Sequence, residues 1–227
     1  MKDSDNPRRH LILLIALLTL IVVGPLLSTS RHGTLIVNVI GAAMLLTALY
    51  AISECNQIFV IAIILSILSI VGTFLLQAYP SHVMVIASHT SLIALLMLFA
   101  VAILGYVVRS GRVTSDKIFA AICAYLLIGY AWAFGYALLD EFQPGAFASP
   151  TEVAPGDYIG RVIQMRYFSY ITLATVGYGD IVPRTSGART MAILEAILGQ
   201  FYLVALIGRL VGLHIVHGTS DRPADRG

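Results

Sequence analysis

A six-residue segment in the last quarter of the chain has the composition needed to bind a dehydrated cation. Its sequence is Thr175-Val176-Gly177-Tyr178-Gly179-Asp180. Glycines at alternate positions adopt positive φ at little cost, so successive backbone carbonyls can turn to one side instead of alternating as in a strand. Such a row, repeated around a symmetry axis, forms rings of oxygen that replace the hydration shell of a passing cation. The hydroxyl of Thr175 would add an oxygen at the inner end.

Irregular backbone of this kind is tolerated inside a membrane only where it lines a path for ions or water. The composition indicates a membrane protein, because 58% of the 227 residues are hydrophobic and only 11% are charged, against about a quarter charged in soluble domains. A bilayer-spanning helix needs about 20 mostly apolar residues. Six runs meet this length: 11–27, 34–52, 58–78, 83–108, 118–139 and 189–216. We therefore predict an all-α membrane protein with six transmembrane helices.

A seventh apolar stretch, 162–174, is too short to cross a bilayer and predicts a re-entrant pore helix that ends at the segment 175–180. Its C-terminal partial negative charge would favour a cation beyond it. The complete predicted organisation is an N-terminal tail 1–10, a four-helix peripheral bundle 11–108, a linker 109–117, a pore domain 118–216 with an outer loop 140–161, and a tail 217–227.

Basic residues near the helix ends predict the orientation, since they gather on the cytoplasmic side. With alternating helices they fall on one side: Lys2, Arg8, Arg9, Arg109, Arg112, Lys117, Arg222 and Arg226. Both termini are therefore expected in the cytoplasm, and the protein in the plasma membrane. The loop 140–161 then lies outside, where its acids are expected to concentrate cations at the outer mouth. These acids are Asp140, Glu141, Glu152 and Asp157.

Several other functions are excluded by the same composition. A net charge of +2 is too small for nucleic-acid binding. Cys55 and Cys123 have no CxxC spacing and no neighbouring histidine, so neither a zinc site nor a disulfide framework is expected. No nucleophile with a base and no paired carboxylates occur in the apolar runs, so we expect neither an enzyme nor a cofactor. A signal peptide is disfavoured by the length of the first run, and the short C-terminal tail predicts no ligand-binding domain.

The segment Thr175–Asp180 resembles the selectivity filter of potassium channels, and the resemblance covers the pore domain 118–216. It implies that the carbonyls of Thr175, Val176, Gly177 and Tyr178 coordinate K⁺, while Gly179 and Asp180 close the outer mouth. One chain supplies one filter strand and a carbonyl ring needs four, so a homotetramer that passes K⁺ down its gradient is expected. Two alternatives stay open: a subunit of an active uptake system, and a non-conducting subunit of another channel.

Residues around the filter are assigned supporting roles. Thr172 precedes it, and the ring of Tyr178 is expected to pack against the aromatic residues of the pore helix. These are Tyr167, Phe168 and Tyr170. The hydroxyl of Tyr167 is expected to reach Asp180. Glu195 is an acid inside an apolar helix and needs a partner, which we expect on the pore helix behind the filter.

The last helix contains the predicted gate. Gly199 stands where similar channels have a hinge glycine, and Gly208 is either a hinge or a close-packing position. Leu203, Ile207 and Leu210 share one helical stripe and could form an apolar constriction. Gln200 is expected to line the cavity beneath the filter.

The first four helices lack the charges of a voltage sensor. Between Arg31 and Arg109 there is no Lys or Arg, and Glu54 is the only acid, so gating by an arginine-rich helix is not expected. The histidines are expected to be structural rather than pH-sensing; they are His82, His89, His214 and His217. The gating stimulus is open, which leaves room for membrane lipids and an unidentified regulatory partner.

Overall fold

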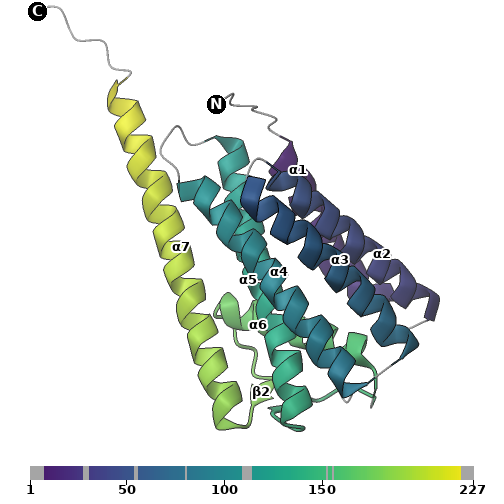
Figure 1. The fold of residues 1–227 in the computed structure, drawn as a ribbon. Coiled ribbons are helices and arrows are strands. Elements are labelled where there is room, and N and C mark those ends of the chain that lie inside the picture. Colours follow the sequence, from purple (N-terminus) through teal and green to yellow (C-terminus); the bar gives the residue numbers. More distant parts are fainter. Residues whose placement is uncertain are drawn as a thin grey trace, which may run out of the picture.

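The protein folds into helices joined by short connections (Figure 1). The computed structural model describes residues 8–27, 31–53, 56–79, 81–108, 114–151, 153–154 and 156–220. Its helices are α1 (Arg9–Leu27), α2 (Arg31–Ala51), α3 (Asn56–Ala78), α4 (His82–Val108), α5 (Ser115–Phe142), α6 (Tyr158–Leu173) and α7 (Ser186–Ser220). Two short strands, β1 (Phe147–Ala148) and β2 (Val182–Pro183), pair antiparallel, with Phe147 opposite Pro183. The sequence did not predict this pairing, because two-residue strands have no periodicity to detect.

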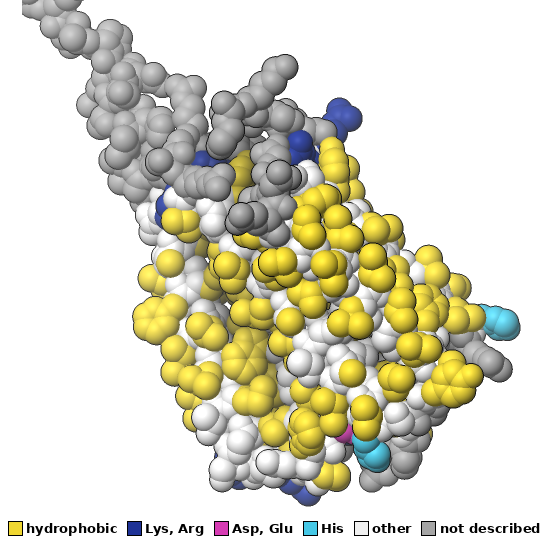
Figure 2. Space-filling view, in the orientation of Figure 1, with side chains coloured by type: hydrophobic (Ala, Val, Ile, Leu, Met, Phe, Trp, Pro, Cys, Tyr) yellow, Lys and Arg dark blue, Asp and Glu magenta, His cyan; other side chains and the backbone are white. Residues whose placement is uncertain are grey.

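Within the described part of the chain, six helices are long and apolar enough to cross a membrane, and α6 is not among them. Large apolar side chains cover much of the face that Figure 2 shows. Val83 is 75% exposed and Leu26 is 72% exposed. A soluble protein does not display apolar surface on this scale. The protein is therefore an all-α integral membrane protein.

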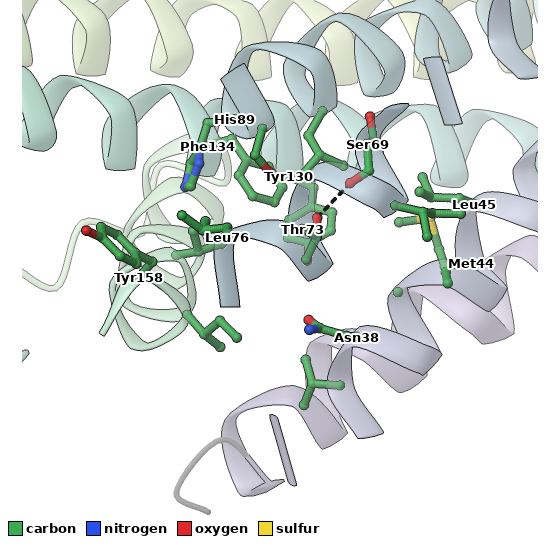
Figure 3. Close-up of a pocket in the computed structure, with 18 of the residues that line it drawn as sticks. Asn38, Met44, Leu45, Ser69, Thr73, Leu76, His89, Tyr130, Phe134 and Tyr158 are labelled. Atoms are coloured by element: carbon green, nitrogen blue, oxygen red, sulfur yellow. Dashed lines mark hydrogen bonds between the residues drawn. The ribbon is translucent and has the colours of Figure 1, made fainter. Parts of the chain in front are cut away.

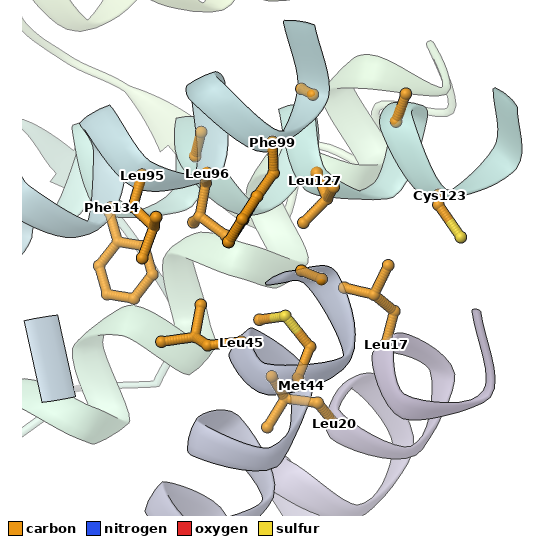
Figure 4. Packing of buried hydrophobic residues seen from close by; sticks show 14 of the residues in the cluster. Leu17, Leu20, Met44, Leu45, Leu95, Leu96, Phe99, Cys123, Leu127 and Phe134 are labelled. Atoms are coloured by element: carbon orange, nitrogen blue, oxygen red, sulfur yellow. The ribbon is translucent and has the colours of Figure 1, made fainter. Parts of the chain in front are cut away.

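The first four helices pack as antiparallel neighbours, and α4 lies along α5 (Figure 1). Buried side chains of α1, α2, α4 and α5 meet in one apolar cluster, seen in Figure 4. Its members include Leu17, Leu20, Met44, Leu45, Leu96, Phe99, Leu127 and Phe134. This shared core holds α5 against the peripheral helices, whereas α7 packs against α6 and α5 away from α1–α3.

Polar caps place the helix ends differently from the sequence-based boundaries. Helix α6 begins at Tyr158, not 162, because Asp157 caps it by accepting a hydrogen bond from the Gly160 N–H over 2.8 Å. Helix α7 begins at Ser186, not 189, because Thr185 Oγ1 accepts from the Ala188 N–H at 3.3 Å. Helix α5 also extends beyond the predicted 118–139 at both ends. The outer loop is therefore shorter than the predicted 140–161.

A buried polar cluster joins the start of α1 to the start of α5. His10 Nδ1 lies 2.8 Å from Asp116 Oδ2, and the Tyr106 hydroxyl donates to the same oxygen at 2.9 Å. The rings of His10 and Tyr106 stack with their centroids 5.0 Å apart. These contacts attach the N-terminal end of α5 to α1 and α4. The cluster could not be predicted from the sequence, because His10 lies far along the chain from Tyr106 and Asp116.

Candidate functional site

The backbone of residues 175–180 has the alternation that a row of carbonyls requires. Gly177 has φ +54° and Gly179 has φ +79°, as expected from the sequence. Thr175 also has a positive φ of 56°, and it is the only non-glycine residue with this conformation in the described part of the chain. A β-branched residue there is strained. Positive φ at every second residue reverses each peptide plane relative to a strand, so neighbouring carbonyls can point the same way.

Hydrogen bonds set the direction in which these carbonyls point. The N–H groups of Val176 and Gly177 both donate to the carbonyl of Ile171, at 2.8 and 3.2 Å, and the Thr175 N–H donates to Thr172 at 2.9 Å. The C-terminal end of α6 thus holds the N–H side of the segment. Because N–H and C=O point in opposite directions across a planar peptide, the carbonyls preceding these amides face away from α6. Residues 174–180 are all exposed in the single chain.

A side chain of α7 holds the inner end of the segment. Gln200 Nε2 donates to Thr175 Oγ1 over 2.9 Å. This bond joins the strained threonine to α7 and places Gln200 directly next to the segment. Thr172, predicted as a supporting residue, is half-buried and contributes its carbonyl to the Thr175 amide.

The outer end is held by the contact predicted between Tyr167 and Asp180. The Tyr167 hydroxyl donates to Asp180 Oδ2 at 2.7 Å, and the Ile181 N–H donates to Oδ1 at 3.0 Å. The hydrogen bond from Tyr167, followed by the backbone amides, lowers the pKa of Asp180 because these donors favour the charged carboxylate. The same bond raises the pKa of the Tyr167 hydroxyl. Asp180 therefore stays ionised in mild acid at the outer end.

Glu195 of α7 is completely buried behind the segment and is bonded to α6, as predicted. Its Oε1 lies 2.5 Å from Ser169 Oγ, and its Oε2 accepts from the Tyr136 hydroxyl at 2.6 Å. Ser169 Oγ also lies 2.6 Å from the Gly129 carbonyl. A serine hydroxyl has one proton, so Ser169 can donate to only one of these two oxygens. If it donates to the Gly129 carbonyl, the contact with Glu195 is a hydrogen bond only when the Glu195 carboxyl is protonated and donates to Ser169. A neutral Glu195 thus joins α5, α6 and α7 through one network.

Within the single chain, Phe168 and Tyr170 contact α5, so the predicted packing of Tyr178 against the pore helix stays a prediction. Phe168 packs its ring against Tyr136, with centroids 5.0 Å apart, and also against Phe147. The Tyr170 hydroxyl donates to the Leu126 carbonyl of α5. The aromatic side chains of α6 thus have different partners: Phe168 and Tyr170 contact α5, whereas the Tyr167 hydroxyl binds Asp180. Tyr178 itself is 73% exposed.

Gly199 contacts the end of α6 closely. A Cβ added at Gly199 would collide with the carbonyl oxygen of Leu173, so close packing alone requires glycine there. At Gly208 an added Cβ would meet nothing within 4 Å among the described residues. Leu203 is partly exposed. The side chains of Ile207 and Leu210, predicted to belong to the constriction, lie outside the described part of the structure, as do those of His214 and His217.

Three acids of the outer loop, Asp140, Glu141 and Asp157, are engaged in local contacts. Asp140 is 6% exposed and pairs with Arg161, and it also accepts from the Ala146 N–H. Glu141 pairs with His82, and Asp157 caps α6. Glu152 lies outside the described residues. These acids hold the outer loop in place by binding backbone N–H groups and the basic side chains of His82 and Arg161.

A family model described as "Ion channel" matches residues 151–213, from the loop before α6 into α7. Together with the apolar helices, this match indicates a membrane ion channel and not an enzyme.

Similar proteins define the class more narrowly. The potassium channel protein kcv of Paramecium bursaria Chlorella virus 1 is 34% identical over 71 residues, which are 31% of this chain and 76% of that protein. Two-pore potassium channel 4 of Arabidopsis thaliana is 40% identical over 60 residues, 26% of this chain and 21% of that protein. Protein LctB of Geobacillus stearothermophilus is 30% identical over 102 residues, 44% of this chain and 74% of that protein. The chain belongs to the potassium channel superfamily, which implies K⁺ as the transported ion.

Proposed function

We propose that four copies of this chain form one central pore and that K⁺ passes through it passively, coordinated by the carbonyls of Thr175, Val176, Gly177 and Tyr178. The observation that carries the proposal is the geometry of the filter backbone. The amides of Thr175, Val176 and Gly177 are bound by the end of α6, which leaves the carbonyls of Thr175 and Val176 facing away from that helix. A stack of carbonyl rings can replace the water around K⁺.

The exposed surface of the single chain supports assembly around an axis. Residues 174–180 are all exposed, and polar backbone without partners is costly in a membrane unless it lines a path for ions. In the part of α7 that could span a membrane, Ser186–Leu206, only 11% of the most apolar 18-residue stretch is buried, and Phe201 is 70% exposed. Neighbouring copies that cover α7 and the ring of Tyr178 would leave only the carbonyl row facing the axis.

In this proposal the chain crosses the membrane six times with both termini in the cytoplasm of a plasma-membrane channel. Helix α6 enters and leaves on the outer side as a re-entrant pore helix. Its 16 residues span about 24 Å at 1.5 Å per residue, less than the roughly 30 Å hydrocarbon core. Its C-terminal end then points toward the pore axis, where its partial negative charge favours a cation.

Gating in this channel does not use an arginine-rich sensor. Helix α4 contains no Lys or Arg, so it has no charge to move through the membrane field. The gate in this proposal belongs to α7. Gly208 has space for a bend, and Gly199 packs on α6. The apolar constriction lies below Gln200 and consists of Leu203, Ile207 and Leu210. Membrane lipids, or a partner protein, supply the stimulus.

Cation flux from liposomes tests this function. Vesicles containing the full chain should release K⁺ when a protonophore provides counter-flow, and should release Na⁺ much more slowly. Gly177→Ala should abolish the difference, because alanine at φ +54° is strained and turns a carbonyl away. Gly105→Ala is the matched control, since an added Cβ meets nothing within 4 Å there. Equal K⁺ and Na⁺ release from the wild-type chain, or unchanged selectivity in Gly177→Ala, would contradict the proposal.

A non-conducting subunit of another channel is the second candidate, and the same vesicles separate it from a channel. That subunit would give no K⁺ release although the protein is folded and tetrameric.

A further inference from the structure

A cavity of about 110 Å³ lies between the peripheral helices and the pore helix. It is bordered by α2, α3, α4, α5 and α6, and the segments around it are seen in Figure 3. Asn38 extends from α2 into the space, opposite Thr73 and Leu76 of α3. Most of the lining is aliphatic or aromatic. A cavity of about 150 Å³ holds benzene, so this one has room for part of an acyl chain.

A buried arginine of α6 borders the cavity. Arg166 is only 3% exposed, and its Nη2 has no hydrogen-bond partner. Its guanidinium lies over the ring of Tyr130, 5.5 Å from the centroid. On the other side it touches α1, where a Cβ added at Gly24 would approach Nη2 to 2.9 Å. No carboxylate in the described part of the chain forms an ion pair with it. A buried guanidinium without an anion is strongly unfavourable.

A second buried donor in the cavity also lacks a partner. Asn38 Nδ2 is buried and receives no hydrogen-bond acceptor in the described structure. The described lining contains no aspartate or glutamate. The other cavity that Arg166 borders contains Asp157 and Asp180, which would repel an anion. The charge pattern therefore favours an anion in the cavity beside Asn38.

We propose that this cavity binds an anionic membrane amphiphile, a molecule with an acyl chain and a carboxylate or phosphate head group. The head group pairs with Arg166 and accepts from Asn38, and the acyl chain lies along the apolar wall. Phe74, which is 41% exposed, belongs to the lining and opens the cavity to the lipid-facing surface. A small inorganic anion would satisfy Arg166 but would leave the apolar wall uncovered.

The position of Arg166 links this site to the filter. It directly precedes Tyr167, which binds Asp180, and it lies three residues before Ser169, which binds Glu195. A bound amphiphile therefore steadies the same helix that orders the filter amides.

Equilibrium binding of radiolabelled oleate and of radiolabelled phosphatidylglycerol tests the proposal, with the full chain in phosphatidylcholine nanodiscs and empty nanodiscs as background. We expect saturable binding of one molecule per chain by at least one of them. Oleate alone would identify a free carboxylate as the source, and phosphatidylglycerol would identify a phospholipid. Arg166→Gln should weaken this binding about tenfold or more, because a charge-assisted hydrogen bond is lost. Arg184→Gln, which removes an exposed arginine, should leave it unchanged.

A second pair of variants tests the cavity without changing charge. Gly41 borders the cavity and an added Cβ there meets nothing within 4 Å, so Gly41→Leu should fill the space and block binding. Gly105→Leu, an equally open site outside the cavity, should bind normally. The comparison of Gly41→Leu with Gly105→Leu tests the binding site even if the Arg166→Gln protein does not assemble. Absence of saturable binding, unchanged binding in Gly41→Leu, or full displacement by inorganic phosphate would overturn the proposal.

Discussion

Replacement of Glu195 offers a sensitive test of the network behind the filter. Glu195→Gln keeps a donor and an acceptor in the same places, since Nε2 can donate to Ser169 and Oε1 can accept from Tyr136. Glu195→Leu has a similar volume and neither group. The two variants therefore separate hydrogen bonding from packing.

The expected magnitudes follow from the contacts. The leucine variant leaves the buried Tyr136 hydroxyl without its acceptor at 2.6 Å and removes the contact to Ser169 at 2.5 Å. An unsatisfied buried donor costs about 1–3 kcal/mol and a lost neutral hydrogen bond about 0.5–1.5, so the free energy of unfolding should fall by roughly 2–4 kcal/mol. The glutamine variant preserves the pattern of a protonated acid and should lose less than about 1 kcal/mol.

Unfolding of the purified protein by SDS titration in neutral micelles measures these differences. The sequence contains one tryptophan, Trp132, whose ring lies 5.8 Å from that of Tyr136, so its fluorescence reports on the network directly. If Glu195→Gln loses as much stability as Glu195→Leu, Glu195 is not the neutral hydrogen-bonding group described here.

Three further variants test other contacts. Tyr167→Phe removes the donor that lowers the pKa of Asp180. In wild type this bond stabilises the fold fully above the usual carboxyl pKa and is lost as the pH falls through the lowered pKa of Asp180. In the variant Asp180 is protonated at a higher pH, so K⁺ flux should fail at a higher external pH than in wild type; an unchanged pH profile would be evidence against the bond. Gly199→Ala should lower the free energy of unfolding by about 1–3 kcal/mol through overpacking on the end of α6, whereas Gly208→Ala should be tolerated; equal tolerance would show that the close contact does not matter. Asp116→Ala leaves His10 and Tyr106 without their shared acceptor and should destabilise the fold by about 1–3 kcal/mol, measured by the same titration; no loss would show that the cluster contributes nothing.

The helices and the filter backbone were predictable because each depends on local sequence. Long apolar runs give helices whatever their neighbours, and the positive φ of Gly177 and Gly179 follows from residue type. Asp157, three residues before Gly160, is also a local cap signal, and with it the start of α6 could have been placed correctly.

Hydrogen bonds between helices could be predicted only where a charged side chain inside an apolar helix needed a partner. The acid Glu195 had to find a donor, and the pore helix was the nearest source, but nothing in the sequence indicated that Tyr136 would share it. The faces of α6 were harder to assign, since aromatic residues occur on several sides and Phe168 and Tyr170 turn to α5. The positive φ of Thr175 depends on tertiary contacts with α6 and Gln200, so residue type argued against it.

The reversal potential of the purified protein in a planar bilayer, with KCl on one side and an equal concentration of NaCl on the other, tests the central claim most directly. The carbonyl row predicts a reversal potential far from zero with the sign of K⁺ selectivity, and its loss in Gly177→Ala. A wild-type reversal potential near zero would show that the segment 175–180 does not select K⁺.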